Sequence, residues 1–219
     1  MMKPEPGTAA INYQVYRSED GEEMTALLAD VFTRRDPLAL AAGIKAQEFA
    51  LFVRALLPKA AEERLTIVAR FAGSGEMVGA VLTNDPASEA DFAMEVLGRE
   101  FAMVGSILGE LVTAYRAGRE PAPGEQLHLY LLGVSEYATG MGVGQGLVAA
   151  CLENGARRGY RIAVAEATNK TSQHIFRKLG FQERALISYN DHLYEGEHIF
   201  ARIAEHGGPI LMERMLAPA

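Results

Sequence analysis

Four glycines at alternate positions are the residues whose spacing first indicates chemistry in this sequence. Gly140, Gly142, Gly144 and Gly146 lie in the stretch TGMGVGQG, between a leucine-rich run and a run of helical character. A glycine lets the backbone turn with positive φ, so that successive N–H groups form a concave anion-binding nest. The N-terminus of the helix that starts near Gly144 adds partial positive charge. The stretch therefore predicts a phosphate or pyrophosphate site, the alternative being a turn that only needs room.

Two common nucleotide-binding patterns do not fit this stretch. The P-loop pattern GxxxxGK[ST] needs a lysine directly after the glycines, and none follows. The dinucleotide pattern GxGxxG fails because Leu147 stands where its third glycine belongs, and residues 135–139 separate the glycines from the preceding strand. A P-loop and a dinucleotide-binding turn are both excluded.

Two carboxylates lie where a base could act on a substrate. Asp36 separates two helical patterns and precedes Pro37, so it could face a cleft, but Asp-Pro is also a common pair at a helix N-cap. Glu48 lies four residues after Ile44 and four before Phe52, on an apolar face where a carboxylate is costly to bury alone. An amine could be its partner, or the side chain could reach solvent. The residues by themselves leave these alternatives open.

Other candidate residues favour a structural role. Cys151, the only cysteine, shares an apolar face with Leu147 and Val148, which predicts core packing. The five histidines show no metal-ligand spacing, so we expect no metal. Three aromatic residues in one helical stretch could line an amine pocket or belong to the core: Phe92, Phe101 and Tyr115.

The elements that must position these residues alternate between strand and helix. Strands are predicted at 11–17, 64–72, 76–84, 127–134, 160–167, 184–189 and 209–216. One helix is predicted to begin at an Asp20–Glu23 capping pair. Further helices are predicted over 37–57, 86–118, 144–158 and 171–180. This alternation predicts an α/β fold. We expect one domain over 1–219 with a helical insert at 85–125, because no repeat or linker divides the chain.

Composition and charge limit the class of protein. With 219 residues, 49% hydrophobic and 22% charged, the chain is typical of globular proteins. A formal net charge of −7 without a long basic run disfavours nucleic acid or an anionic membrane as partner and permits a cationic small substrate. The sequence has neither a signal-peptide core nor a long apolar run, so we expect a cytoplasmic protein, monomeric or homodimeric.

At the glycines and the segment N..S...F.KLGF, from Asn169 to Phe181, the chain resembles the GNAT superfamily of acyl-CoA-dependent N-acyltransferases. The resemblance implies a central mixed, mostly antiparallel sheet of about seven strands, splayed between strands four and five. Helices would cover both faces, and the helical insert would lie between strands three and four. It also implies acetyl-CoA as co-substrate.

The superfamily's [QR]xxGx[GA] loop receives the pyrophosphate of coenzyme A, and its first position falls on Thr139. The threonine loses one side-chain contact but leaves the backbone donors available. Backbone amides after the splay would stabilise the oxyanion, and Gly133 is compatible with a bulge there. The implied donor-binding residues are Leu132, Gly133, Val134, Thr139, Gly140, Met141, Gly142, Val143, Gly144, Asn169 and Ser172.

Within the superfamily the pattern is similar to the insect-type arylalkylamine N-acetyltransferases, which include the dopamine N-acetyltransferases. FTRRDPL occupies the place of their F...EPL segment, so Asp36 maps to their catalytic base, while Thr168 and Ser172 map to a pair of serines. Phe176 stands where many relatives carry a tyrosine that protonates the leaving thiolate. Ser172, one turn earlier, is the expected replacement. The catalytic candidates are therefore Asp36, Glu48, Thr168 and Ser172.

The function expected from the sequence is acetyl transfer from acetyl-CoA to a small primary amine, an arylalkylamine, by direct attack in a ternary complex. A polyamine or aminoglycoside acetyltransferase is the alternative within the enzyme class. An acyl-CoA-binding sensor without turnover is the alternative outside it.

Overall fold

A seven-stranded sheet forms the centre of the molecule, in a computed structural model that describes residues 10–88 and 97–217. The strand order is β1-β2-β3-β4-β5-β7-β6, in which only the β4–β5 pair is parallel. The strands are β1 (Ile11–Val15), β2 (Ile67–Phe71), β3 (Met77–Asn84), β4 (Gln126–Val134), β5 (Ile162–Ala167), β6 (Gln182–Leu186) and β7 (Ile210–Met215).

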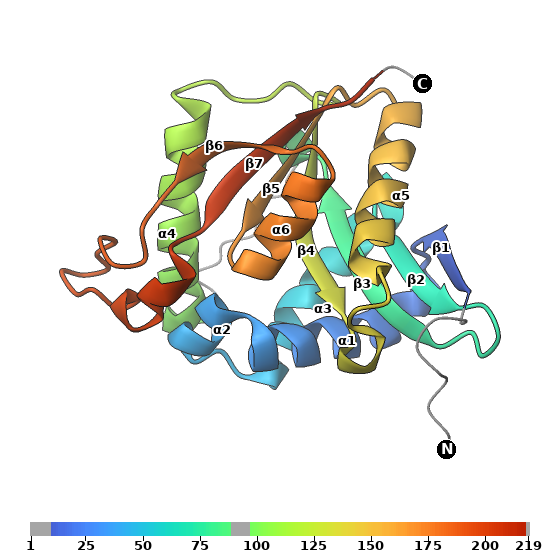
Figure 1. The fold of residues 1–219 in the computed structure, drawn as a ribbon, viewed down its shortest axis with the longest axis horizontal. Coiled ribbons are helices and arrows are strands. Elements are labelled where there is room, and N and C mark those ends of the chain that lie inside the picture. The colour runs from blue at the N-terminus through green and yellow to red at the C-terminus, as the bar shows by residue number, and fades with distance from the viewer. Residues whose placement is uncertain (1–9, 89–96, 218–219) are drawn as a thin grey trace.

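Helices cover both faces of this sheet (Figure 1). They are α1 (Gly21–Arg35), α2 (Pro37–Ala42), α3 (Ala46–Glu63), α4 (Arg99–Arg116), α5 (Val143–Arg157) and α6 (Lys170–Lys178). Helices α1 to α4 contribute to one hydrophobic core and α5 and α6 to the other. The predicted mixed sheet with helices on both faces is confirmed. The part of the insert described by the structure contains α4, between β3 and β4.

The sheet opens between β4 and β5. Their pairing covers only three residue pairs, from Gln126 with Ile162 to His128 with Val164, although β4 continues to Val134. Beyond that point the pairing stops, and within the described residues the edge of β4 that faces β5 has no further strand partner. This wedge is the predicted splay between strands four and five.

A bulge lies in β4, but not at the expected glycine. Opposite β3, Leu82 pairs with Leu131 and the next residue pairs with Leu129, so Tyr130 is the extra residue. The bulge reverses the side-chain alternation, which sends Leu129 into the core under α5 and Leu131 into the core under α1. Gly133 pairs regularly with a β3 residue instead.

Two predictions about the first helices are wrong. Asp20 and Glu23 do not cap α1: Asp20 accepts hydrogen bonds from Arg17 N and Arg70, and Glu23 accepts one from the backbone N–H of Met77. These carboxylates join α1 to the sheet.

The predicted helix over 37–57 is two helices, because Gly43 ends α2 in the left-handed region with φ of 83°. Helix α3 then continues to Glu63 with Pro58 inside it, since Ala60 beyond the proline is still buried.

Among the residues that the structure describes, no helix is long and apolar enough to span a bilayer. Phe92, one of the three predicted aromatic residues of the insert, lies outside the described residues.

Gly133 allows α1 to approach β4. A Cβ at this position would lie 2.7 Å from Leu28 Cδ2, in a fully buried contact. We therefore expect Gly133→Ala to lower the free energy of unfolding by about 1–3 kcal/mol, the usual cost of overpacking. Gly109→Ala in α4, where an added Cβ meets no atom within 4 Å, is the matched control and should be neutral or stabilising. Urea denaturation of both variants checks this, and equal stability of the two would contradict the close contact.

Candidate active site

A cavity of about 840 Å³ lies at the wedge between β4 and β5. The glycine loop 139–144 and side chains of α1 to α4 contribute to its wall. The wedge edge of β4 and the N-terminal turn of α6 also line it. Residues of a glycine-rich loop and apolar side chains therefore line one continuous cavity.

The glycine loop has the backbone shape that an anion site needs. Gly140 and Gly142 are left-handed, with φ of 84° and 78°, and Gly142 is the N-cap of α5. No acidic residue lies in the first turn of α5, and no atom of the described part of the chain lies within 4 Å of a Cβ built on Gly140 or Gly142. The N-terminal N–H groups of α5 therefore stay available to an anionic ligand without a competing carboxylate.

The other two glycines of the series serve packing. A Cβ on Gly144 would lie 3.1 Å from Ile175 Cδ1, so this glycine allows α5 to approach α6. Gly146 does not line the cavity, and a Cβ there would overlap the ring of Tyr13. The sequence pattern thus combined one left-handed turn with two close packing contacts.

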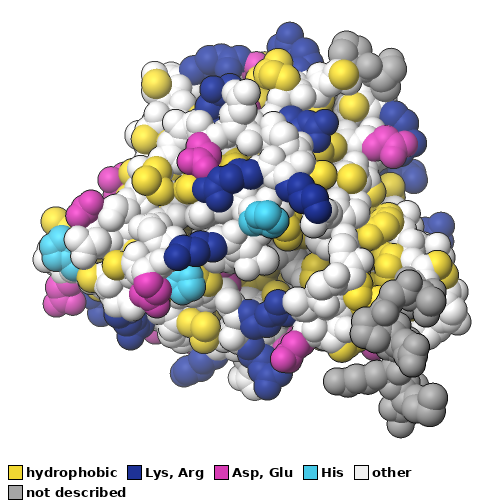
Figure 2. Space-filling model, in the orientation of Figure 1, with side chains coloured by type: hydrophobic (Ala, Val, Ile, Leu, Met, Phe, Trp, Pro, Cys, Tyr) yellow, Lys and Arg dark blue, Asp and Glu magenta, His cyan; other side chains and the backbone are white. Residues whose placement is uncertain are grey.

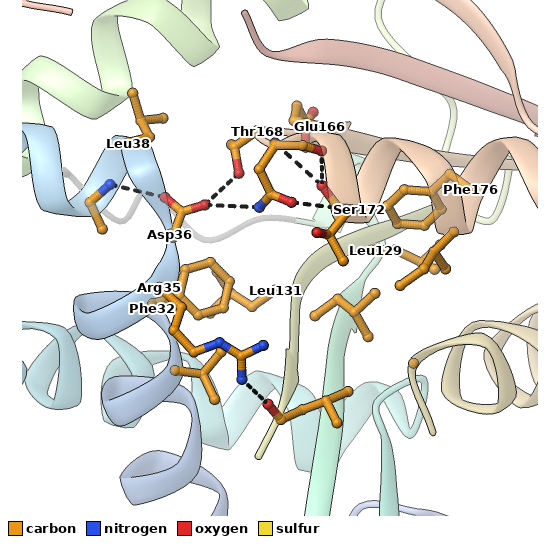
Figure 3. A pocket seen from close by; sticks show the side chains of 18 of the residues that line it. Phe32, Arg35, Asp36, Leu38, Leu129, Leu131, Glu166, Thr168, Ser172 and Phe176 are labelled. Carbon is orange, nitrogen blue, oxygen red and sulfur yellow. Dashed lines mark hydrogen bonds between the residues drawn. The ribbon is translucent and has the colours of Figure 1, made fainter. Parts of the chain in front are cut away.

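Asp36 stands at the junction of α1 and α2 and lines the cavity (Figure 3). One carboxylate oxygen accepts a hydrogen bond from Ala39 N at 2.9 Å, which is the N-cap contact of α2. The other accepts one from Thr168 Oγ1 at 2.6 Å and one from Asn169 Nδ2 at 3.4 Å. Asp36 therefore caps α2 and at the same time accepts hydrogen bonds from Thr168 and Asn169.

Burial makes Asp36 a stronger base than an exposed aspartate. Only 7% of the residue is exposed, and burial raises the pKa of its carboxyl against the opposing effect of the hydrogen bonds from Thr168, Ala39 and Asn169. A carboxylate with a raised pKa takes up a proton more readily near neutral pH, as a general base requires.

Three predicted site residues lie at the N-terminal end of α6 and line the cavity near Asp36. Asn169 caps the helix, since its Oδ1 accepts from Ser172 N at 3.0 Å, and the hydroxyl of Ser172 donates to the carbonyl of Asn169 at 2.9 Å. Thr168, Asn169 and Ser172 all line the cavity. Phe176, one turn further, is buried against Phe181 and offers no proton.

The wedge edge of β4 exposes alternate peptide groups. Ser135 N donates to Val78 O on β3 at 2.9 Å, so by the antiparallel alternation Gly133 also bonds toward β3. The peptide groups of Leu132 and Val134 then face the wedge. Consistent with this, the carbonyl of Val134 accepts a hydrogen bond from Arg35 at 3.1 Å. Of the three predicted residues, two direct their peptide groups into the cavity and Gly133 does not.

Several aromatic side chains line the cavity, and of these only Phe101 was predicted from the sequence as a candidate for lining an amine pocket. Phe32 and Phe49 stack with centroids 4.9 Å apart, Phe52 meets Tyr130 edge-on at 5.9 Å, and all of them line the cavity. These residues come from α1, α3 and β4, and their spacing within each element is that of ordinary core positions. Only the packing of three elements brings them to one chamber.

A buried acid–base contact was also missed. Glu166 of β5 lines the cavity, and its Oε2 lies 2.6 Å from His128 Nε2 on β4, across the end of the strand pairing. Burial raises the pKa of Glu166, but His128 more than compensates and the pKa is lowered overall. The available signal was a single charged residue in the apolar run IAVAEA.

Three further candidates are not among the residues that line the cavity. Glu48 accepts a hydrogen bond from Lys45 N at 2.9 Å at the start of α3 and is not among the residues that line the cavity. Cys151 is buried beside Thr83, and burial raises the pKa of its thiol to about 12. Tyr115 donates to Glu213 at 2.6 Å outside the cavity. Among the described residues no cluster of three potential metal ligands occurs.

Comparison with known proteins agrees with this architecture. Residues 104–189 match the family of FR47-like proteins. The arylalkylamine N-acetyltransferase 2 of Aedes aegypti superposes with a TM-score of 0.81 at 20% identity, covering 94% of this chain and 99% of that one. The chain has the GNAT fold. The resemblance inferred from the glycine loop and the KLGF segment is confirmed at this level.

Two other solved structures are similar over their full length. The C-terminal condensation domain of Ebony, in complex with β-alanyl-dopamine, has a TM-score of 0.88 at 13% identity, covering 95% of this chain and 100% of that one. The polyamine N-acetyltransferase of Drosophila melanogaster has a TM-score of 0.74 at 23% identity, covering 94% and 100%. No curated protein matches by sequence.

Two substitutions at Asp36 distinguish the loss of its hydrogen bonds from the loss of its charge. Asparagine can cap α2 with its amide oxygen while its amide nitrogen donates to the hydroxyl oxygen of Thr168, whereas alanine can do neither. We expect Asp36→Ala to lower the free energy of unfolding by about 1–3 kcal/mol, from the lost cap and the unpaired threonine hydroxyl. Asp36→Asn should be as stable as the wild type near neutral pH or more so, because it removes a buried charge. Chemical denaturation at pH 7 compares them, and equal losses would argue against the cap.

Proposed function

We propose that this protein is an acetyl-CoA-dependent N-acetyltransferase, formed by a single domain, that acts on a small primary amine, and that the amine is an arylalkylamine. One observation carries the proposal. The glycine loop and a group of aromatic side chains line a single cavity, and the hydrogen-bonded pair of Asp36 and Thr168 lines it too. Such a cavity can hold a phosphate-bearing donor and an aromatic amine at once, as direct transfer requires.

The residues present fit an acyl-CoA donor. The loop 139–144 offers backbone donors and a helix N-terminus to the pyrophosphate, and the open edge of β4 offers Leu132 and Val134 to the amide groups of the pantetheine arm. Asn169 and Ser172 lie on the opposite wall of the cavity. The thioester would supply the electrophilic carbonyl carbon.

Asp36 is the proposed base. An alkylamine has a pKa near that of lysine, about 10, so it arrives as an ammonium without a lone pair. The carboxylate of Asp36, with its raised pKa, would take this proton directly or through a water molecule. Thr168 holds the carboxylate in place at 2.6 Å, so that the proton acceptor faces the wedge.

The acyl transfer then follows from the remaining groups. The amine nitrogen forms a bond to the carbonyl carbon, and the carbonyl electron pair moves to oxygen, where a backbone N–H of the β4 edge stabilises it. The carbonyl re-forms as the carbon–sulfur bond breaks, and the nitrogen, which is positively charged after the attack, releases its second proton to solvent. The departing thiolate takes a proton from the hydroxyl of Ser172, which is in turn reprotonated from solvent, since Phe176 cannot donate.

The aromatic chamber favours an arylalkylamine as acceptor. Rings stacked and edge-on around a cavity suit a flat aromatic ligand. Two similar structures agree: one is an arylalkylamine N-acetyltransferase, and another binds β-alanyl-dopamine, an amide of an arylalkylamine.

The second candidate acceptor is a dicationic amine such as agmatine or a polyamine. The carboxylate of Glu166 in the cavity wall favours it, because a second cation could bind there. The Drosophila melanogaster polyamine enzyme among the similar structures forms N-acetylagmatine.

The deciding experiment is thiol release from acetyl-CoA across a panel of amines. The panel contains tyramine, tryptamine, phenethylamine, histamine, agmatine, spermidine and an aminoglycoside, with wild type and Asp36→Ala. We expect selective turnover of the arylalkylamines and a loss of about 100-fold or more in kcat for the variant, the usual contribution of a general base. Turnover confined to the polycations would favour the second candidate. Binding of CoA without thiol release would instead indicate a sensing module.

The raised pKa of Asp36 predicts the acid side of the pH profile. The carboxyl must be ionised to accept a proton, so kcat should fall as pH drops through its pKa, at a midpoint above the ordinary value of 3.8. Asp36→Asn has no carboxyl there, so its residual kcat should lack this midpoint. The measurement is kcat from pH 4 to 8 with both substrates saturating. The same acid midpoint in the variant would assign it to another group.

A further inference from the structure

Arg35 occupies an unusual position in the cavity wall. It is the last residue of α1, directly before Asp36, and its side chain lines the cavity (Figure 3). Its guanidinium donates to the carbonyl of Val134 at 3.1 Å and to Thr139 Oγ1 at 3.4 Å. It therefore links the open edge of β4 to the first residue of the loop, across 104 positions of sequence.

The charge of Arg35 is not balanced by a carboxylate. Both of its hydrogen-bond partners are neutral, and no ion pair of Arg35 is found within 10–88 and 97–217. The preceding residue is different, since Arg34 forms an exposed pair with Asp30 at 3.3 Å on its own helix. A guanidinium has five donors and binds phosphate in a bidentate manner, so Arg35 retains the capacity for a further anion.

The surroundings favour an anion at this point. The loop beside the guanidinium turns through two left-handed glycines into the N-terminus of α5, with no acidic residue in its first turn. Although the net charge of the chain is −7, Lys and Arg side chains gather around α6 on the face shown in Figure 2. A local positive potential of this kind attracts an anionic ligand to the cavity.

A purely structural role explains less. A basic residue in the last turn of a helix stabilises the helix dipole, but Arg34 already serves α1 in this way. That role does not require a side chain to extend across the wedge. Nor does stabilisation of the helix dipole explain why the guanidinium donates to the carbonyl of Val134, one of the groups that a donor substrate would need.

We propose that Arg35 binds the phosphate groups of the acyl donor and, before the donor arrives, covers the edge of β4. It would supply, from a helix distant in sequence, the cation that the loop lacks at Thr139. When the donor enters, the guanidinium exchanges the carbonyl of Val134 for a phosphate oxygen and uncovers that carbonyl for the pantetheine arm. The identity of the donor rests on the proposed function.

This exchange has opposite consequences for donors with and without phosphate. Loss of the guanidinium removes a charge-assisted contact to coenzyme A. For pantetheine, which has no phosphate, the same loss only removes a competitor for the carbonyl of Val134. Arg35→Gln should therefore weaken coenzyme A and leave pantetheine binding unchanged or tighter, a pattern that a general loss of structure cannot produce.

Isothermal titration calorimetry with CoA and with pantetheine tests the proposal. The proteins compared are the wild type, Arg35→Gln, Arg35→Lys and Arg34→Gln. For Arg35→Gln we expect Kd of CoA to rise about 10- to 100-fold, the range for a lost hydrogen bond to a charged group. Arg35→Lys should recover part of the loss, because it keeps the charge but not the bidentate geometry. Arg34→Gln is the matched control and should bind both ligands as the wild type does.

Three results would overturn the inference. They are an unchanged Kd of CoA in Arg35→Gln, an equal weakening of CoA and pantetheine, or the same loss in Arg34→Gln. Absence of CoA binding to the wild type would reject both this inference and the proposed donor. CoA binding that depends on Arg35, without thiol release to any amine, would reject only the proposed acetyl transfer.

Discussion

The opening between β4 and β5 is the constraint on which the site depends. A sheet that paired these strands to their ends would hydrogen-bond the edge of β4 internally and leave no room for a ligand. Here pairing stops at His128 and Val164, while β4 continues for six more residues to Val134. The resulting edge is a row of peptide groups available to an extended substrate, as at any unpaired strand. The glycine loop and α5 begin where that edge ends.

An open edge inside a sheet is unfavourable unless its polar groups find other partners. In this protein one of these groups has a side-chain partner, since Arg35 donates to the carbonyl of Val134. Where the strand pairing ends, the side chains of His128 on β4 and Glu166 on β5 meet at 2.6 Å. The bulge at Tyr130, just beyond the last paired residue, reverses the side-chain alternation of β4. Contacts from α1 and β5 therefore border the wedge, and no local sequence pattern describes them.

Asp36 shows how a structural and a chemical requirement can coincide. The chain must leave one helix and begin another at this point, and an aspartate before a proline satisfies both the cap and the change of direction. The same junction lies under the first turn of α6, so the second carboxylate oxygen meets Thr168 and Asn169. Burial of that cluster raises the pKa of the carboxyl, which is the property that a base needs.

The sequence predicted the strands, most helices and the glycine turn, because each depends on residues within one turn or one strand, and it offered the Asp36 cap as one of two open roles. It did not separate the left-handed glycines of the loop, Gly140 and Gly142, from Gly146, which packs against Tyr13, nor place the bulge at Tyr130 rather than Gly133. The aromatic chamber, the Glu166–His128 contact and the reach of Arg35 to Thr139 were decided only by the tertiary structure. Each joins elements far apart in the chain, and the distance between such elements depends on how whole helices and strands pack.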